Sequence, residues 1–514
     1  MSEFRAFELN QKDQTMHKSA IIFLFLLSSH FIFAQTQGIA YTAVGKGVAT
    51  SFLSDYHCIG INASALGWER EFEKKRFTMG TSEFGFGIYS NALTANNLRG
   101  LYNTLRNQAT GSSTDQATRD QQRQFAKDFT NSDVLINVNY NWFGASFQNE
   151  KLGGIALSVS DSYQWESKLG ARMSDLMFNG KYASIFDSLT VVFGNDTTTL
   201  ANSTTISQDT LSNVISGNFA VPVSLSYLAE GTRIKSQWTR SYNLSYGRKI
   251  FGRDNVFVLY GGIGARYIQA IAMFDMESNG SSIQMNSALS PSFNIDYSSI
   301  SSGSPSFSGT NQRGFPPKGV GTGYGLDFSL SAKLFKKITL AAAVNNIGQI
   351  RYKRNVFTVN DTLIGSYSVA GIDSDNITQA VNSLLQDGGL LNIEGEQEFS
   401  ISNPATFRVG VSIKFGKILN VGFDFVAPFD RENPGSISNP VFAFGGEVRP
   451  LRWLALSAGY FGGGIYKNNI PVGINFILGK GTYEFGVSSR DMLSFFMQES
   501  NSVSLAMGFM RFRF

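Results

Sequence analysis

The adjacent residues His57 and Cys58 are the first place to look for chemistry, because imidazole and thiol groups serve as general bases, nucleophiles and metal ligands. The chain has one cysteine and three histidines, and His17 and His30 lie in a segment expected to be removed on export. Neighbouring side chains of an extended chain point to opposite faces. A zinc or copper site would have to rest on carboxylates. These residues therefore predict a protein without enzymatic activity, cofactor or metal.

Two further motifs invite a ligand but lack its spacing. Asp373 and Asp375 could begin a calcium loop, but Leu384 stands where an EF-hand needs its bidentate Glu, so they are interpreted as helix N-cap residues. Gly45–Gly47 lacks the GxxxxGK[ST] spacing of a phosphate loop and indicates a turn. The net charge of +4, without a basic cluster, argues against nucleic-acid binding. Function must then follow from how larger elements position polar side chains.

The last hundred residues, 407–514, alternate with a period of two. One parity of a predicted strand is apolar: Ile470, Val472, Ile474, Phe476 and Leu478. The other parity is small or polar, as at Gly473 and Asn475, and a turn at Gly479–Gly481 leads to a second such strand. Charged residues are only 16% of the chain, which has 52 Gly and 44 Phe. Strands with apolar side chains on the outer face and small or polar side chains on the inner face are typical of a membrane β-barrel.

Long and short connections alternate between the predicted strands, as they do in outer-membrane barrels. The predicted strands are Arg76–Ser90, Val134–Phe147, Gly153–Trp165, Ile234–Tyr246, Val256–Phe274, Gly323–Ala332, Ile338–Phe357 and Phe407–Phe415, followed by close hairpins. The sequence therefore predicts an all-β fold, a transmembrane antiparallel barrel of about fourteen strands over residues 75–514. Ser282–Asp296 is assigned to a loop, since another strand would make the count odd. Short helices are expected in two long extracellular loops, at Leu98–Leu105 and Ile377–Leu384.

The N-terminus has the pattern of a secretory signal. A charged start near Met16, an apolar run over Ala20–Phe33 and a small residue at Ala34 predict a cleaved signal in region 1–34, with Met16 as the natural start. The run is shorter than the roughly 20 residues of a membrane helix. The expected location is the cell outer membrane, with both termini on the periplasmic side.

Residues 35–74 are predicted to form a hatch inside the barrel. Fourteen strands enclose more space than wall side chains can fill, and this segment is rich in small residues. The candidate hatch and lumen residues are Asn62, Leu66, Asn137, Asn139, Asn141 and Asp327. In the final strand, a change of parity predicts a β-bulge near Phe509–Met510 that turns Phe512 and Phe514 toward lipid.

Asn62 and Leu66 match an Asn-Pro-Ala-x-Leu-like motif, with Ala63 and Ser64 in place of proline and alanine. The segment therefore resembles the hatch of FadL-type long-chain fatty-acid transporters, in an uncharacterised branch related to the barrel subunit of type IX secretion. The ending at Phe512 and Phe514 resembles the assembly signal of outer-membrane barrels.

This resemblance implies passive uptake of a hydrophobic small molecule across the outer membrane. The alternative is a scaffold or accessory subunit of an outer-membrane assembly or secretion complex. Expected partners are outer-membrane lipid, the barrel assembly machinery, and a hydrophobic small molecule or an envelope complex. Gly261–Gly264 either open the wall to such a molecule or pack against the hatch.

Overall fold

The computed structural model describes residues 40–69, 75–92, 116–203, 206–253, 256–293, 305–307, 314–367, 392–437, 439–463, 468–492 and 501–514, all within the unit Ala34–Phe514. The predicted signal region, the two predicted loop helices, Asp373 and Asp375 lie outside these residues. None of the described helices has both the length and the apolar character to cross a membrane.

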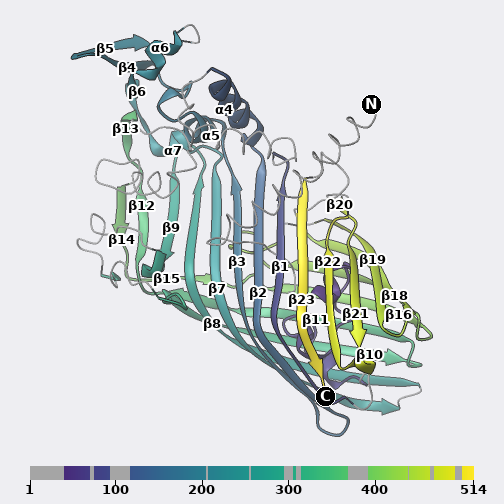
Figure 1. The fold of residues 1–514 in the computed structure, drawn as a ribbon. Helices are drawn as coiled ribbons and strands as arrows, with labels where there is room; N and C mark the ends of the chain where they lie inside the picture. Colours follow the sequence, from purple (N-terminus) through teal and green to yellow (C-terminus); the bar gives the residue numbers. More distant parts are fainter. Residues whose placement is uncertain are drawn as a thin grey trace, which may run out of the picture. The chain divides into compact units, whose positions relative to one another are not determined.

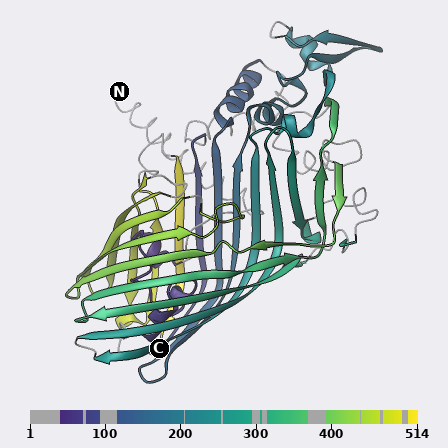
Figure 2. The same cartoon turned by 180° about the vertical axis from the view of Figure 1, so that it is seen from behind.

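Fourteen antiparallel strands pair in a ring that closes where the first meets the last (Figures 1 and 2). In order around the ring they are β1 (Phe77–Ser90), β2 (Asp133–Asn149), β3 (Gly153–Lys168), β7 (Arg233–Arg253), β8 (Phe257–Ser278), β10 (Gly321–Leu334), β11 (Ile338–Tyr352), β16 (Thr406–Phe415), β17 (Leu419–Pro428), β18 (Val441–Leu451), β19 (Leu454–Gly463), β21 (Val472–Leu478), β22 (Tyr483–Ser489) and β23 (Ser502–Arg513). The predicted fourteen-stranded antiparallel barrel is confirmed.

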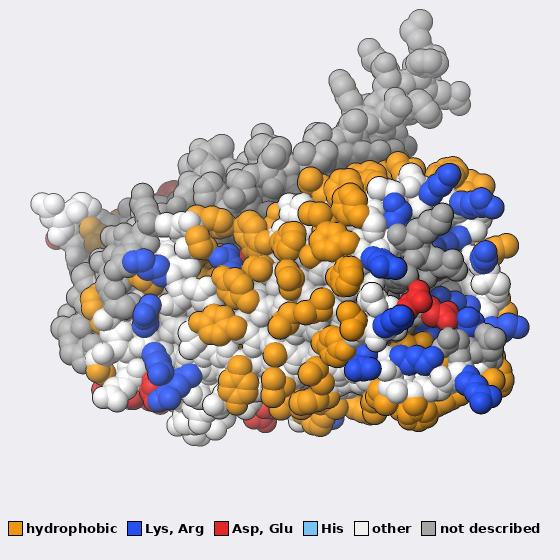
Figure 3. Space-filling view, turned by 90° about the horizontal axis from the view of Figure 1, so that it is seen from below, with side chains coloured by type: hydrophobic (Ala, Val, Ile, Leu, Met, Phe, Trp, Pro, Cys, Tyr) orange, Lys and Arg blue, Asp and Glu red, His pale blue; other side chains and the backbone are white. Residues whose placement is uncertain are grey.

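The alternation along each strand separates an apolar outer face from a polar inner face. Ile474 is 46% exposed on the outside, whereas its neighbour Asn475 is 5% exposed on the inside. Figure 3 shows hydrophobic side chains over the middle of one face, with Lys and Arg on both sides of them and more at one end. The exposed Lys336, Lys337 and Arg452 lie in the short turns. An apolar band that ends at a charged rim is the surface expected of a wall in a bilayer.

The position of the apolar band predicts how much a charged substitution costs at different depths in the bilayer. Phe328 is 50% exposed in the middle of β10, and Phe335 is 61% exposed in the turn after it. We expect Phe328→Arg to cost about 2–4 kcal/mol of folding free energy, because the guanidinium would face hydrocarbon, and Phe335→Arg no more than about 1 kcal/mol at the rim. Urea titration in lipid vesicles measures both, and equal losses would contradict the position of the band.

The long connections build structure at the opposite end from the short turns (Figure 1). A four-stranded sheet there consists of β4 (Ser188–Phe193), β5 (Asp196–Ala201), β6 (Val214–Ser224) and β13 (Leu363–Tyr367). The other elements of the connections are α4 (Gln116–Phe129), α5 (Ala171–Asn179), η3 (Gly180–Tyr182), α6 (Gln208–Ser212), α7 (Leu225–Leu228), β9 (Ile283–Leu289), η4 (Pro291–Phe293), β12 (Val356–Asn360), β14 (Asn392–Gly395), β15 (Phe399–Ser402), β20 (Asn468–Asn469) and the short turn η5 (Gly479–Gly481).

Two strand assignments and one omission are corrected by these elements. Ser282–Asp296 contains strand β9, which pairs with β8 and β12 outside the ring, so an added strand need not change the ring's count. Ile338–Phe357 is two strands, because the chain turns at Asn355, whose φ is 49°. Helix α4 escaped prediction because few of its residues are apolar, and they pack as one small cluster with Phe178.

The last strand has the predicted bulge. Phe509 and Met510 together oppose Phe485, since Gly508 pairs with Gly486 and Arg511 pairs with Glu484. The bulge changes the parity of the residues that follow it, so Phe514 is 57% exposed on the outside. Its backbone exchanges hydrogen bonds of 2.8 and 3.1 Å with Phe77, which joins the chain's end to β1.

We predict that Phe514→Ala lowers the amount of folded protein in the outer membrane several-fold, because an aromatic terminus resembles the assembly signal. Phe509→Ala is the matched control, since Phe509 is also an exposed phenylalanine of β23, at 48%. Quantitative immunoblots of heat-modifiable bands from membrane fractions measure both variants. Equal levels of the two would mean that the terminal position has no special role.

Candidate functional site

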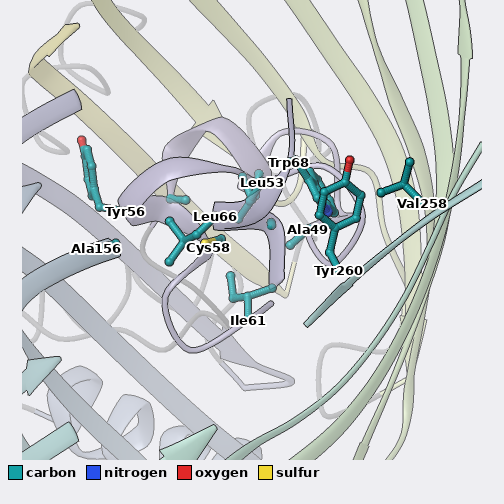
Figure 4. Close-up of a cluster of buried hydrophobic side chains, with 13 residues drawn as sticks. Ala49, Leu53, Tyr56, Cys58, Ile61, Leu66, Trp68, Ala156, Val258 and Tyr260 are labelled. Carbon is teal, nitrogen blue, oxygen red and sulfur yellow. The ribbon is translucent and has the colours of Figure 1, made fainter. Parts of the chain in front are cut away.

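Residues 40–69 lie inside the ring as three short helical turns: α2 (Tyr41–Val44), η1 (Asp55–Cys58) and η2 (Ala63–Gly67). This segment is called the hatch here. Its apolar side chains pack on one another and on Val258 and Tyr260 of β8 (Figure 4). Every strand of the ring has a residue against it: Glu83, Gly144, Gly154, Gly247, Gly262, Ser329, Asn345, Ser412, Asp424, Gly445, Gly459, Gly473, Ser488 and Arg511.

Glycines of the wall let the hatch backbone come close. A Cβ on Gly262 would lie 2.1 Å from the amide nitrogen of Ser64, and one on Gly445 would lie 1.9 Å from the carbonyl oxygen of Lys46. Side chains at these positions would collide with main chain. Strand β8 also stays paired with β10 throughout Gly261–Gly264. Packing against the hatch is therefore seen at Gly262, whereas Gly261 and Gly264 face side chains of the wall.

One side of the hatch is held by a buried carboxylate. Asp424 of β17 accepts hydrogen bonds from the amides of Ala49 and Thr50, at 2.7 and 2.9 Å, and from the Thr50 hydroxyl at 2.9 Å. Nearby, Lys46 forms an ion pair of 2.6 Å with Glu447 of β18. These bonds satisfy a hatch turn that has no partner strand of its own.

A second part of the hatch is held by buried ion pairs with β22 and β23. Arg511 of β23 bonds Asp55 of the hatch and, at 2.8 Å, Glu484 of β22. Glu484 is also bonded by Arg513. The side chains of Arg511 and Asp55 are only 5% and 6% exposed. A buried charge is tolerated only with a partner, so this pair fixes the hatch to the wall.

His57 and Cys58 have separate surroundings. The His57 ring lies 2.9 Å from Glu83 through Nε2 and 3.1 Å from the Thr42 hydroxyl through Nδ1, and Glu83 also accepts a 2.5 Å hydrogen bond from Tyr56. Burial raises the pKa of the Cys58 thiol well above its ordinary value. A hydroxyl, an imidazole and a carboxylate in line also occur in hydrolases. Thr42, however, does not line the cavity described next. The hydrogen bonds from Thr42 through His57 to Glu83 therefore serve to hold the hatch against β1.

A cavity of about 200 Å³ lies between the hatch and the wall. One side consists of hydroxyl and amide side chains from β2, β3 and β7: Asn139, Asn141, Ser158, Ser160, Ser162, Gln164, Gln237, Thr239, Ser241 and Asn243. The rest of the lining mixes polar and charged side chains with apolar ones. The apolar ones include Ile59 and Ile61 of the hatch, Ile268 of β8, Ile350 of β11 and Pro404. The cavity is therefore amphipathic.

The charged groups that line this cavity are already paired. Glu83 is held by His57 and Tyr56 and by Asn141, whose amide donates at 2.9 Å. Arg266 donates to both carboxylate oxygens of Asp327, at 2.6 and 2.7 Å. The lining therefore offers hydrogen-bonding groups without an unpaired charge.

The predicted lumen residues fall in three places. Asn62 bonds within the hatch, donating to the Thr50 carbonyl at 2.8 Å, and Leu66 is 1% exposed in the hatch core. Asn137, Asn139 and Asn141 are buried on the inner face, and the last two line the cavity. Asp327 lies beside the cavity as the partner of Arg266. Their functional roles remain predictions.

Sequence reasoning missed the anchors Glu83, Asp424 and Arg511 and the polar side chains of β3 and β7. A charged residue at an inward position of its strand was the available signal. Phe512, the other predicted assembly residue, packs against the ring of Tyr483 with centroids 5.1 Å apart.

The wall beside the cavity is interrupted between β1 and β23, and a second interval without strand pairing lies between the pairs Asn345–Thr406 and Gln349–Ser402. Strands β1 and β23 pair at Thr81–Met510 and again at Phe84–Met507, and no pairing joins them between these points, a part of the wall that is fully described. Ser82 lies in this interval with φ 56°, a conformation that side chains rarely adopt. Its neighbour Glu83 lines the cavity. The interruption therefore lies next to the cavity.

Comparisons with known proteins give one family model and several solved structures. The model described as "Family of unknown function (DUF5723)" matches residues 186–483, more than half of the chain. No curated protein matches.

The crystal structure of the Pseudomonas putida toluene transporter TodX has 9% identity and a TM-score of 0.41, over 94% of this chain and 99% of that one. The crystal structure of the Ralstonia pickettii toluene transporter TbuX has 10% sequence identity and a TM-score of 0.44, over 93% of this chain and 99% of that one. The crystal structure of a Pseudomonas aeruginosa FadL homologue has 12% sequence identity and a TM-score of 0.35, over 93% of this chain and 97% of that one. What this chain binds has to be inferred from its own residues.

Proposed function

We propose that this chain, which belongs to the DUF5723 family, is an outer-membrane channel for the passive uptake of a small hydrophobic molecule. The observation that carries the proposal is the amphipathic cavity, whose lining includes the apolar side chains of Ile59, Ile61, Ile268 and Ile350. Burying an apolar molecule against such a surface stabilises it by about 25 cal/mol per Å² of apolar area. A cavity of this size suits a small molecule rather than a protein segment.

The hatch directs where such a molecule can go. It contacts all fourteen strands and is held by buried ion pairs, so it obstructs a straight path to the periplasm. The unpaired interval between β1 and β23 is a weak part of the wall beside the cavity, because strands without ladder pairing separate at lower cost. A molecule that leaves there enters the bilayer, which an apolar solute tolerates and an ion does not.

A reversible cross-link tests this route. Ser82 and Phe509 occupy the interval, so Ser82→Cys with Phe509→Cys should close it with a disulfide. The cross-link should abolish the protein-dependent part of the uptake of a radiolabelled C8 alcohol by whole cells, and reductant should restore it. The control joins the same strands at a paired position, with Ile88→Cys and Val503→Cys. Unchanged uptake in the cross-linked test variant would contradict lateral exit.

The second function implied by the resemblance is an accessory subunit of an envelope complex, such as the one that serves type IX secretion. It stays a prediction, and the same chain can test it. If uptake is absent in the intact protein and a stoichiometric protein partner co-purifies after mild extraction, the scaffold replaces the channel.

A further inference from the structure

We infer that the rim of short turns binds the head groups of anionic phospholipids, such as phosphatidylglycerol, in the leaflet that the rim reaches. The rim is the set of turns that join β2 to β3, β7 to β8, β10 to β11, β16 to β17, β18 to β19 and β21 to β22. The inference needs a ring that spans a bilayer, and it does not depend on what passes through that ring.

The rim carries an excess of positive charge. Each turn has an exposed cation, either between its two strands or in the last residue of the first strand. In chain order these cations are Lys151, Arg253, Lys336, Lys337, Lys417, Arg452 and Lys480. Among the turn residues that the structure describes, Glu150 is the one acidic residue. Closure of the ring brings cations that are far apart in sequence to one rim.

The protein does not neutralise much of this charge. At the opposite end of the ring, Arg172 lies 2.5 Å from Glu230. Lys417, Arg452 and Lys480 form no such ion pair within the described part of the chain. Their positive charge therefore needs anions from outside the protein.

Exposed apolar side chains lie in or beside each of the same turns. Phe335, directly before Lys336, is 61% exposed, and Trp453, directly after Arg452, is 46% exposed. The others of this kind are Leu152, Phe251, Ile418 and Leu478. At a bilayer interface such side chains enter the hydrocarbon, while neighbouring Lys and Arg reach the head groups.

The distribution around the ring favours lipid over a protein partner. A cation and an exposed apolar side chain occur together at every short turn, so no single sector of the rim is marked out. Lipid surrounds a barrel on all sides, whereas a bound protein would cover one sector. The phosphate of a lipid accepts charge-assisted hydrogen bonds from Lys and Arg. A zwitterionic lipid also brings an ammonium group, which the rim repels, so anionic lipids should gather there.

Spin-labelled lipids measure this preference. The protein is reconstituted in phosphatidylcholine vesicles that contain a trace of spin-labelled phosphatidylglycerol or of spin-labelled phosphatidylcholine. The fraction of label immobilised by the protein gives the relative association constant of the two lipids. We expect a preference of about threefold for phosphatidylglycerol, because each cation near the head groups attracts an anionic lipid. Sodium chloride at about 0.5 M should reduce it, because salt screens exposed charges.

Two quadruple variants assign the preference to the rim. The test variant carries Lys337→Gln, Lys417→Gln, Arg452→Gln and Lys480→Gln. The matched control removes four exposed cations from connections at the opposite end, with Lys127→Gln, Lys353→Gln, Arg354→Gln and Arg431→Gln. Heat-modifiable gel migration establishes that both variants fold. We expect the preference to fall toward one in the test variant and to stay about threefold in the control.

Two results would overturn the inference. Equal association of both lipids with the unmodified protein would favour an acidic protein partner for the rim. An equal loss of preference in the two variants would show that the rim has no special role. Uptake of the C8 alcohol is measured separately, so either result leaves the proposed channel to stand or fall by its own test.

Discussion

Deleting Thr36–Leu66, with the predicted signal and cleavage site kept, should turn a closed barrel into one that conducts ions. The hatch occupies the inside of a fourteen-stranded ring, whose lumen is too wide for wall side chains to fill. Asp424, Glu83 and Arg511 would lose hatch partners, but water entering the lumen would solvate them, so the wall can stay folded. In planar bilayers we expect conductance to rise by at least an order of magnitude over the intact protein.

A second deletion controls for the loss of chain length. Residues 188–201 form the hairpin of β4 and β5 in the sheet outside the ring, and their removal should leave conductance at the level of the intact protein. Heat-modifiable gel migration establishes that both variants fold. A hatch deletion that folds and stays electrically silent would show that the structures built by the long connections seal the lumen.

The barrel was predictable because each wall strand carries its own period-two pattern. Ile474 and Asn475 differ in parity, and that difference alone places one in lipid and the other in the lumen. The same pattern does not show whether a strand belongs to the ring. In β9 the buried Ile283, Met285 and Ser287 alternate with the exposed Gln284 and Asn286. The segment was assigned to a loop because one more strand would have made the strand count of the barrel odd.

The hatch anchors could not be predicted because they join residues far apart in sequence. Thr50 and Asp424 are separated by 374 positions, and the sequence around either residue does not indicate that the other is its partner. The asparagines of β2 were found because they repeat at one parity within a single strand. Gln237 and Thr239 of β7 share that inner face, but they occur in a strand whose outer face also carries polar residues such as Arg240, so the contrast between faces was hidden.

Removing the buried arginine that joins the hatch to the wall should destabilise the protein strongly. Arg511→Ala would leave Asp55 without its cation and Glu484 with Arg513 alone, while both carboxylates remain buried. Breaking a buried ion pair in this way costs about 3–5 kcal/mol, because the remaining charge has lost both water and its partner. That is a large share of the roughly 5–15 kcal/mol that stabilises a typical fold.

The exposed ion pair between Lys336 and Glu69 is the matched control, because it also links the wall to the hatch segment. Its atoms lie 3.2 Å apart, and its side chains are 49% and 48% exposed. Lys336→Ala should therefore cost no more than about 1 kcal/mol. Urea titration of protein refolded in vesicles gives the free energy of unfolding of each variant, and ion leakage reports loosening of the hatch. If Arg511→Ala loses no more stability than Lys336→Ala and does not leak, the buried pair does not hold the hatch in place.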